Sequence, residues 1–176
     1  MDNHIGEIII SEKELDQITT DLARQISSDF KDSGKKLLLI GILKGSFMFL
    51  SDIAKKLTIP AEIDFIKLSS YNKDKTTGKV TVDFGLSVEN PEDYNMLIIE
   101  DIIDSGITLS FLKSHFKEKG YNDVKCCALL DKFERRVVDC RADYIGKKIP
   151  DLFIIGYGMD YCQLYRNLPY IAVFNP

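Results

Sequence analysis

The sequence predicts an α/β fold with a mostly parallel central sheet flanked by helices. Short apolar segments alternate along the chain with segments of helical periodicity, a pattern typical of parallel sheets. Residues 37–42 and 96–99 contain no polar side chain, as expected for strands that helices cover on both faces. The length of 176 residues fits one domain, which we expect to span residues 1–176.

The first elements are predicted from local signals. An apolar strand is expected at 7–10. Ser11 followed by Glu14 has the sequence of a capping box, which predicts that a helix begins there. Apolar residues at helical spacing continue this helix to Phe30, and Gly34 is its expected end.

The remaining elements follow from the same patterns. We expect helices at 46–57 and 107–119, and strands at 37–42, 61–68, 79–84, 96–99, 124–130, 151–155 and 170–174. A polar turn at 72–78 indicates that the two strands around it form an antiparallel ribbon. Ligands of parallel sheets bind at the carboxyl ends of the strands, so the residues that follow each strand are the candidates for a site.

Composition excludes several classes of protein. The chain has 23 Lys and Arg against 27 Asp and Glu, a net charge of −4, which argues against a nucleic-acid partner. No apolar stretch is long enough to span a membrane, and the start of the chain does not resemble a signal peptide. The cysteines form no CxxC pair and only two histidines accompany them, so we expect reduced thiols, no structural zinc and a cytoplasmic location.

The segment 96–109 carries the strongest functional signal. Glu100 and Asp101 follow an apolar strand, Asp104 comes next, and Ser-Gly-Ile-Thr at 105–108 opens a helix. The free N–H groups at a helix start can hold a phosphate, and the carboxylates can accept from sugar hydroxyls or bind magnesium. Three crowded carboxylates repel one another unless a cation or a ligand rich in donors is present. Neither GxxxxGK[ST] nor GxGxxG occurs, which excludes a nucleotide P-loop and a dinucleotide fingerprint.

This segment resembles the signature with which phosphoribosyltransferases bind 5-phosphoribosyl-1-diphosphate. Four other segments resemble, in chain order, parts of the hypoxanthine–guanine branch of that family: its diphosphate loop (41–46), the start of its lid (68–71), its purine-contacting segment (129–136) and its base-stacking strand and loop (151–161). The resemblance implies a type I phosphoribosyltransferase fold, with a small hood from the N-terminal segment and roughly residues 150–176. It also implies a homo-oligomer, either a dimer or a tetramer.

On the sugar side, the resemblance implies that Asp104 is the general base. Glu100 and Asp101 correspond to the pair that holds the ribose hydroxyls near magnesium, and Arg166 corresponds to an arginine that contacts diphosphate. The family often has a non-proline cis peptide before the lysine of the diphosphate loop. The residues expected to bind 5-phosphoribosyl-1-diphosphate are Lys44, Gly45, Glu100, Asp101, Asp104, Ser105, Gly106, Ile107, Thr108 and Arg166.

On the purine side, Lys132 matches the residue that donates to the 6-oxo group, Phe153 the stacking aromatic ring, and Ile154 a residue whose backbone meets the base edge. Asp160 resembles an acid at the base and metal side of the site. The implied reaction joins phosphoribose to hypoxanthine or guanine with Mg²⁺, in purine salvage. The implied lid residues are Ser70 and Tyr71, and the implied metal ligands are Glu100, Asp101 and Asp160.

Two departures and several alternatives accompany this interpretation. Phe133 stands where relatives often have proline, and Ile107 where some have lysine. A regulator that senses the diphosphate sugar on the same fold, without catalysis, is one alternative. A phosphoribosyltransferase for xanthine, adenine or a pyrimidine is another. Taken singly, Lys132 could be a solvated lysine and Phe153 a core residue.

Overall fold

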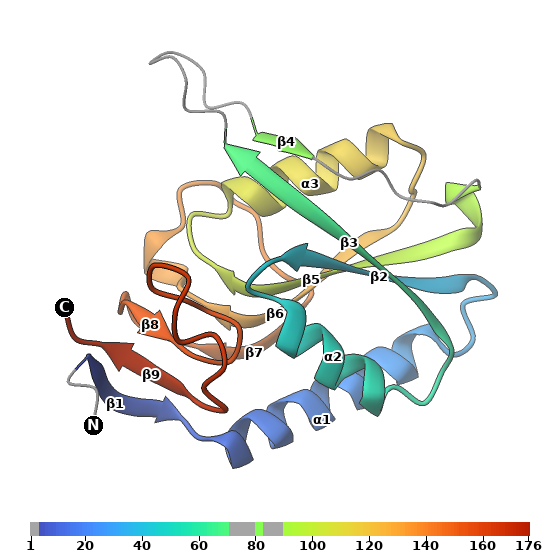
Figure 1. Ribbon diagram of the computed structural model, residues 1–176. Coiled ribbons are helices and arrows are strands. Elements are labelled where there is room, and N and C mark those ends of the chain that lie inside the picture. The colour runs from blue at the N-terminus through green and yellow to red at the C-terminus, as the bar shows by residue number, and fades with distance from the viewer. Residues whose placement is uncertain (1–3, 71–79, 83–89) are drawn as a thin grey trace.

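The structure is a computed structural model that describes residues 4–70, 80–82 and 90–176. It contains a central six-stranded sheet in the order β4-β3-β2-β5-β6-β7 and a three-stranded sheet in the order β1-β9-β8 (Figure 1). The helices are α1 (Glu12–Phe30), α2 (Phe47–Lys56) and α3 (Ile107–Glu118). The strands are β1 (Ile5–Ile10), β2 (Lys36–Leu43), β3 (Ala61–Ser70), β4 (Val80–Val82), β5 (Tyr94–Ile103), β6 (Val124–Asp131), β7 (Tyr144–Lys148), β8 (Ile154–Ile155) and β9 (Ile171–Phe174).

The central sheet confirms the predicted fold class. Strands β3, β2, β5, β6 and β7 run parallel, and β4 joins β3 as the antiparallel edge strand. Helices α1 and α2 lie on one face and α3 lies on the other, so each face has its own apolar core (Figure 1). Residues 37–42 of β2 and 96–99 of β5 are buried on both faces, which explains why they contain no polar side chain.

The smaller sheet brings the two ends of the chain together. Strand β1 pairs antiparallel with β9, with Ile5 opposite Phe174, and β9 pairs antiparallel with β8 (Figure 1). We call this sheet and the loop at 156–166 the hood. The apolar residues of this sheet, Ile10, Ile154 and Ile171, belong to the same core as α1 and α2, so the hood is packed against the central sheet.

The capping box that predicted the start of α1 is confirmed. The backbone N–H of Glu14 donates to the Ser11 hydroxyl oxygen (3.3 Å), and the backbone N–H of Ser11 donates to Oε2 of Glu14 (2.8 Å). Two donors that the helix leaves without intrahelical partners are thereby satisfied. The helix ends at Phe30, so Gly34 lies in the following loop, where its φ of 70° suits glycine.

Other boundaries differ from the sequence prediction. Strand β5 continues through both carboxylates to Ile103, because its backbone still pairs with β6 there. Strand β7 was not predicted, since this edge strand of five residues is only half-buried and includes two lysines. The strand predicted at 151–155 shortens to β8, because Leu152 N–H donates to the Pro150 carbonyl (2.8 Å) and closes a turn.

Part of the predicted antiparallel ribbon is described. Ser70 ends β3 and lies opposite Val80, while Tyr71 and the predicted turn at 72–78 lie outside the described residues. Within the described ranges, no helix is long and apolar enough to cross a membrane.

Candidate active site

The predicted site residues meet at the carboxyl end of the central sheet. Lys44 follows β2, Asp104 follows β5 and Lys132 follows β6, three neighbouring parallel strands. The backbone N–H of Lys132 donates to the carbonyl of Ile103 (2.9 Å), which joins the ends of β5 and β6. The hood loop meets this edge at Gly45, so the site lies between the central sheet and the hood.

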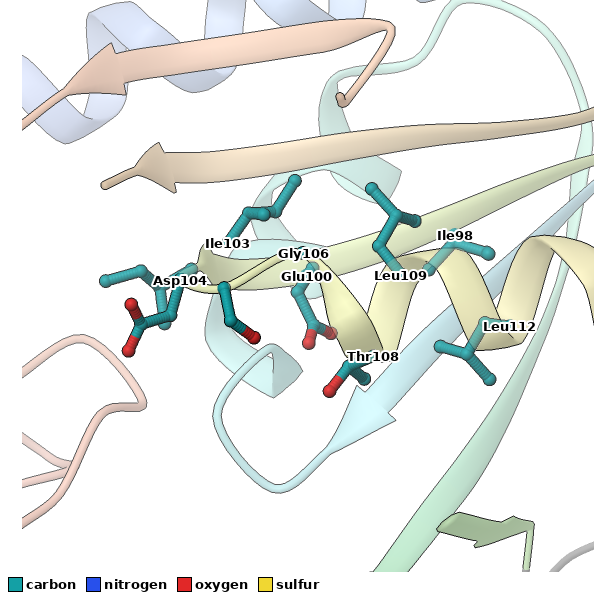
Figure 2. Close-up of a pocket in the computed structure, with 10 residues that line it drawn as sticks. Ile98, Glu100, Ile103, Asp104, Gly106, Thr108, Leu109 and Leu112 are labelled. Atoms are coloured by element: carbon teal, nitrogen blue, oxygen red, sulfur yellow. The ribbon is translucent and has the colours of Figure 1, made fainter. Parts of the chain in front are cut away.

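The loop at 104–108 has the form of an anion site at the start of α3. Gly106 caps the helix with φ 82°, a conformation that other residues rarely adopt. The first N–H groups of a helix have no intrahelical partners and can bind an anion. A cavity of about 80 Å³ lies beside the loop, with Glu100, Ser105 and Thr108 in its lining (Figure 2).

Residues 136–138, which follow β6, pack against this loop, and no pattern in the sequence indicated that contact. The backbone N–H of Val137 donates to the Ser105 carbonyl (3.0 Å). The Arg136 side chain lies under Gly106, forms an ion pair with the buried Asp131, and donates from Nη1 to the Cys140 carbonyl (2.9 Å). A Cβ atom at Gly106 would lie 2.9 Å from Cδ of Arg136, so glycine is required by space as well as by φ.

Glu100 and Asp101 serve different sides of the site. Successive residues of a strand point to opposite faces. Glu100 accordingly points into the cavity beside Thr108 (Figure 2), whereas Asp101 packs against Gly45. Glu100 lines the cavity by the phosphate loop and Asp101 does not, while the role of both acids in holding the ribose hydroxyls stays a prediction.

Burial disfavours the charged form of both acids and raises the pKa of each. Burial raises the pKa of Glu100 well above its usual range, and the charge of Asp101 raises it further. Burial also raises the pKa of Asp101 to about 6, against the lowering effect of backbone N–H donors and of Arg166. Oε2 of Glu100 is buried and has no hydrogen-bond partner in the described part of the chain. A ligand with hydroxyl donors would satisfy that oxygen.

The diphosphate loop expected after β2 packs closely against Asp101 and against the backbone of the hood loop at Gly158. The peptide bond between Leu43 and Lys44 is cis, as the resemblance implied. A Cβ atom at Gly45 would overlap the Asp101 carboxylate, and one at Gly158 would overlap the Gly45 carbonyl oxygen. Three segments far apart in the sequence therefore touch at Gly45, and only glycine fits there.

The hood loop carries Arg166 and contacts Lys44. Arg166 donates from Nη1 to the Gly158 carbonyl (2.7 Å), and its Nη2 lies 2.6 Å from Oδ1 of Asp160. The backbone N–H of Gln163 donates to Oδ2 of Asp160 (2.8 Å), and Nζ of Lys44 donates to Oε1 of Gln163 (2.9 Å). Gln163 thus links the diphosphate loop to the hood, a role that no pattern in the sequence indicated.

The lysine expected to contact the purine is not a solvated surface residue. The Lys132 side chain is only 9% exposed, and its Nζ lies 3.5 Å from Oδ1 of Asp151. A buried ammonium group is costly unless it has a partner, so this side chain is held where a second acceptor would be favourable. The surface-lysine explanation is therefore wrong.

The residues expected at the base ring occupy the hood edge. Phe153 is 55% exposed, which excludes a core role, and its ring meets Tyr161 and Phe174 edge-on at 5.9 and 5.6 Å. Ile154 lies opposite Val173, while the Phe174 N–H donates to the Phe153 carbonyl (2.9 Å). That bond makes Ile154 and Val173 a non-hydrogen-bonded pair, so the N–H and C=O of Ile154 point to the free edge of β8.

Asp104 is a half-exposed carboxylate, with 42% of its side chain accessible. Its Oδ1 lies 3.0 Å from Nε of Arg135 without forming a hydrogen bond, so this contact is one of charge. Its Oδ2 has no hydrogen-bond or ion-pair partner among the residues that the structure describes. One oxygen of this carboxylate is thus free to accept a proton.

The three acids named as metal ligands do not form a ready-made site. Within residues 4–70, 80–82 and 90–176, no three His, Cys, Asp or Glu side chains gather to hold a metal ion. Glu100 lines the cavity by α3, whereas Asp101 and Asp160 lie near each other on the hood side, where the charge of Asp160 raises the pKa of Asp101. Two carboxylates with substrate oxygens suit Mg²⁺, which rarely uses a cage made of protein alone.

The chain is similar to known proteins over nearly its whole length. The model of the phosphoribosyl transferase domain matches residues 8–162. A hypoxanthine-guanine phosphoribosyltransferase of Staphylococcus aureus is 42% identical and covers 100% of this chain and 97% of its own. A hypoxanthine phosphoribosyltransferase of Salmonella typhimurium is 42% identical and covers 96% of this chain and 95% of its own.

Solved structures give the same result for the fold. A hypoxanthine-guanine phosphoribosyltransferase from Bacillus anthracis has a TM-score of 0.89 and 45% identity, and covers 98% of this chain and 99% of its own. A hypoxanthine phosphoribosyl transferase from Trypanosoma cruzi, studied for the role of its C-terminal region in oligomeric state and activity, has a TM-score of 0.92 and 35% identity. That match covers 100% of this chain and 94% of the other.

Proposed function

The chain belongs to the phosphoribosyl transferase family, and from that premise we propose that it transfers phosphoribose from 5-phosphoribosyl-1-diphosphate to hypoxanthine and guanine. The reaction releases diphosphate and serves purine salvage. The observation that supports a 6-oxopurine is the buried ammonium of Lys132, whose partner Asp151 lies two residues before the exposed ring of Phe153. An ammonium has donors and no acceptor, so it suits an oxo group.

The sugar half of the substrate is bound by donors and charges of both sheets. The N–H groups at the start of α3, with the hydroxyls of Ser105 and Thr108, hold the 5′-phosphate. Glu100 accepts from the ribose hydroxyls through its unpartnered oxygen. Lys44 and Arg166, which the hood loop brings to the same side, stabilise the negative charge of the departing diphosphate.

Bond breaking at the sugar leaves positive charge on the ribose ring, and a ring nitrogen of the purine then attacks. Oδ2 of Asp104 accepts the proton that this nitrogen carries. When Mg²⁺ is bound, Asp101 and Asp160 would hold it together with substrate oxygens, and it supplies positive charge against the diphosphate. The purine itself stacks on Phe153 and meets the free N–H and C=O of Ile154.

An assay of nucleotide formation tests the proposed function. Purified protein with the diphosphate sugar and Mg²⁺ should convert hypoxanthine and guanine to their nucleotides, with diphosphate released in equal amount. Formation of nucleotide from xanthine in preference to both would favour the xanthine alternative. Binding of the diphosphate sugar without turnover of any base would favour a regulator on the same fold.

The location and assembly of the enzyme are also proposals. A reducing compartment, the cytoplasm, is supported by the four cysteines, all of which are unpaired in the structure. A homo-oligomer, a dimer or a tetramer, is supported by membership of a family in which the oligomeric state of the T. cruzi relative has been studied. We propose small-molecule substrates as its binding partners, and neither nucleic acid nor membrane.

Removing the charges of Glu100 and Asp101 should weaken binding of the diphosphate sugar. The double variant Glu100→Gln/Asp101→Asn loses acceptors for hydroxyls and metal, and a hydrogen bond to a charged group is worth about 1.5–3 kcal/mol. We expect a fall in affinity of roughly 10-fold to 10²-fold in titration calorimetry with Mg²⁺. The control Glu118→Gln/Asp123→Asn changes the net charge equally at two exposed positions and should bind as wild type. Equal affinity of both double variants would contradict the assignment.

Gly45→Ala should raise the KM for the diphosphate sugar by about 10-fold to 10²-fold. A methyl group would overlap the Asp101 carboxylate, so the diphosphate loop must shift, and a displacement of about 1 Å can cost 10²-fold. The KM for hypoxanthine should stay near the wild-type value in initial-rate measurements. Gly34→Ala is the control for a destabilised backbone: its φ of 70° strains an alanine, but the added methyl group meets open space away from the site, so both KM values should stay near wild type. An unchanged sugar KM in Gly45→Ala would show that this contact does not set the loop.

A further inference from the structure

Four charged side chains form a line across the purine end of the site. Nε of Arg135 lies 3.0 Å from Oδ1 of Asp104, and Nη1 of Arg135 lies 3.5 Å from Oδ1 of Asp151. That same Oδ1 lies 3.5 Å from Nζ of Lys132. The line runs from the end of β5, through the turn after β6, to the segment before β8, and charge alternates in sign along it.

A contribution to the stability of the fold does not explain why these four charged side chains lie together. Arg135, Asp104 and Asp151 are each about half exposed, at 51%, 42% and 50%. Exposed ion pairs contribute little to the free energy of folding, because water screens them and both side chains lose freedom. Yet the two ends of the line are the two groups that the proposed reaction needs at the purine: the proton acceptor and the buried lysine.

The geometry of Arg135 explains how one side chain can order both ends. A guanidinium spreads its positive charge over a rigid plane, so Nε can face one carboxylate while Nη1 faces the other. Arg135 engages Oδ1 of Asp104 and leaves Oδ2 without a partner among the described residues. A lysine at this position would offer a single point charge and could not set both carboxylates in this way.

We propose that Arg135 is a positioning residue: it fixes the Asp104 carboxylate with Oδ2 toward the purine and, through Asp151, places Lys132 for the same base. The inference rests on the proposed function, since it names a residue that acts through the proton acceptor. Arg135 itself needs no contact with substrate.

The first test compares Arg135→Met with wild type. We expect kcat with hypoxanthine to fall on the order of 10-fold to 10²-fold, the cost of a misplaced reacting group. The KM for the diphosphate sugar and the thermal midpoint should stay near wild type, because the side chain is half exposed and the 5′-phosphate is held by N–H groups and hydroxyls at 105–108 rather than by Arg135. Arg135→Lys should recover part of the loss. Arg141→Met, an exposed arginine 3.7 Å from Asp139, is the matched control and should be fully active.

A double variant separates positioning from a general structural effect. In the Asp104→Asn background the carboxylate to be positioned is gone and only the placement of Lys132 remains to be disturbed, so adding Arg135→Met should cause a smaller loss of kcat than it does in wild type. Equal losses in the two backgrounds, or full activity of Arg135→Met, would overturn the inference while leaving the proposed function intact. A wild-type protein that makes no nucleotide from any base would overturn the proposed function, and the inference with it.

Discussion

Asp104→Asn should lower kcat by roughly 10²–10⁴-fold, the usual contribution of a positioned general base. An amide has the shape of the carboxylate but cannot take up the purine proton. The loss should fall on kcat and hardly on the KM of the diphosphate sugar, because the phosphate is held by N–H groups and hydroxyls at the start of α3. Initial rates with hypoxanthine, with each substrate varied in turn, measure both constants.

The control for this variant is Asp139→Asn. Asp139 is almost fully exposed and makes only a loose pair with Arg141, so the substitution removes the same charge away from the reaction. Both variants should unfold close to the wild-type temperature. If Asp104→Asn keeps a kcat within a few-fold of wild type, Asp104 is not the proton acceptor, and another group must remove the proton.

The second large effect concerns the choice of base. Wild-type protein should use hypoxanthine and guanine and reject adenine by up to about 10⁴–10⁵ in kcat/KM. The 6-amino group of adenine is a donor, and the Lys132 ammonium has only donors, so the two would face each other in a poorly hydrated site. Asp151, whose Oδ1 lies 3.5 Å from Nζ of Lys132, can only accept hydrogen bonds from that ammonium and cannot relieve the clash.

Lys132→Met tests this argument within one protein. It should lower kcat/KM mainly for hypoxanthine and guanine, which narrows their advantage over adenine. Phe153→Ala should instead weaken all three bases alike, since an aromatic ring stacks on any purine. Lys117→Met, an exposed lysine late in α3, controls for the loss of charge. Equal use of adenine and hypoxanthine by wild type would refute the assignment of Lys132 and the 6-oxopurine with it.

Much of the fold was predictable because its signals are local. Ser11 and Glu14 satisfy each other's backbone groups within one turn, so the start of α1 needs no information from elsewhere. Residues 37–42 of β2 and 96–99 of β5 are apolar because helices cover both faces of the sheet. The phosphate site at 104–108 could also be predicted, since a glycine and hydroxyl residues at a helix start provide donors for an anion.

The parts that escaped prediction depend on contacts between distant segments. Strand β7 contains a glycine and two lysines in five residues, and only pairing with β6 makes it a strand. The opposite directions of Glu100 and Asp101 depend on β5 continuing past its apolar part. Arg135 and Asp151 are ordinary charged residues in sequence, and their relation to Asp104 exists only after the chain has folded.

The meeting of Gly45, Asp101 and Gly158 bears on how the protein acquires activity. These residues lie far apart in the sequence, so their contact forms only after the long chain segments between them have been brought together. Contacts of this kind form slowly during folding. A chain with its parallel sheet already assembled, but its hood not yet docked, would contain most of the native secondary structure and still lack a place for diphosphate. Recovery of catalysis is therefore a later and stricter measure of the native state than recovery of helix and strand content.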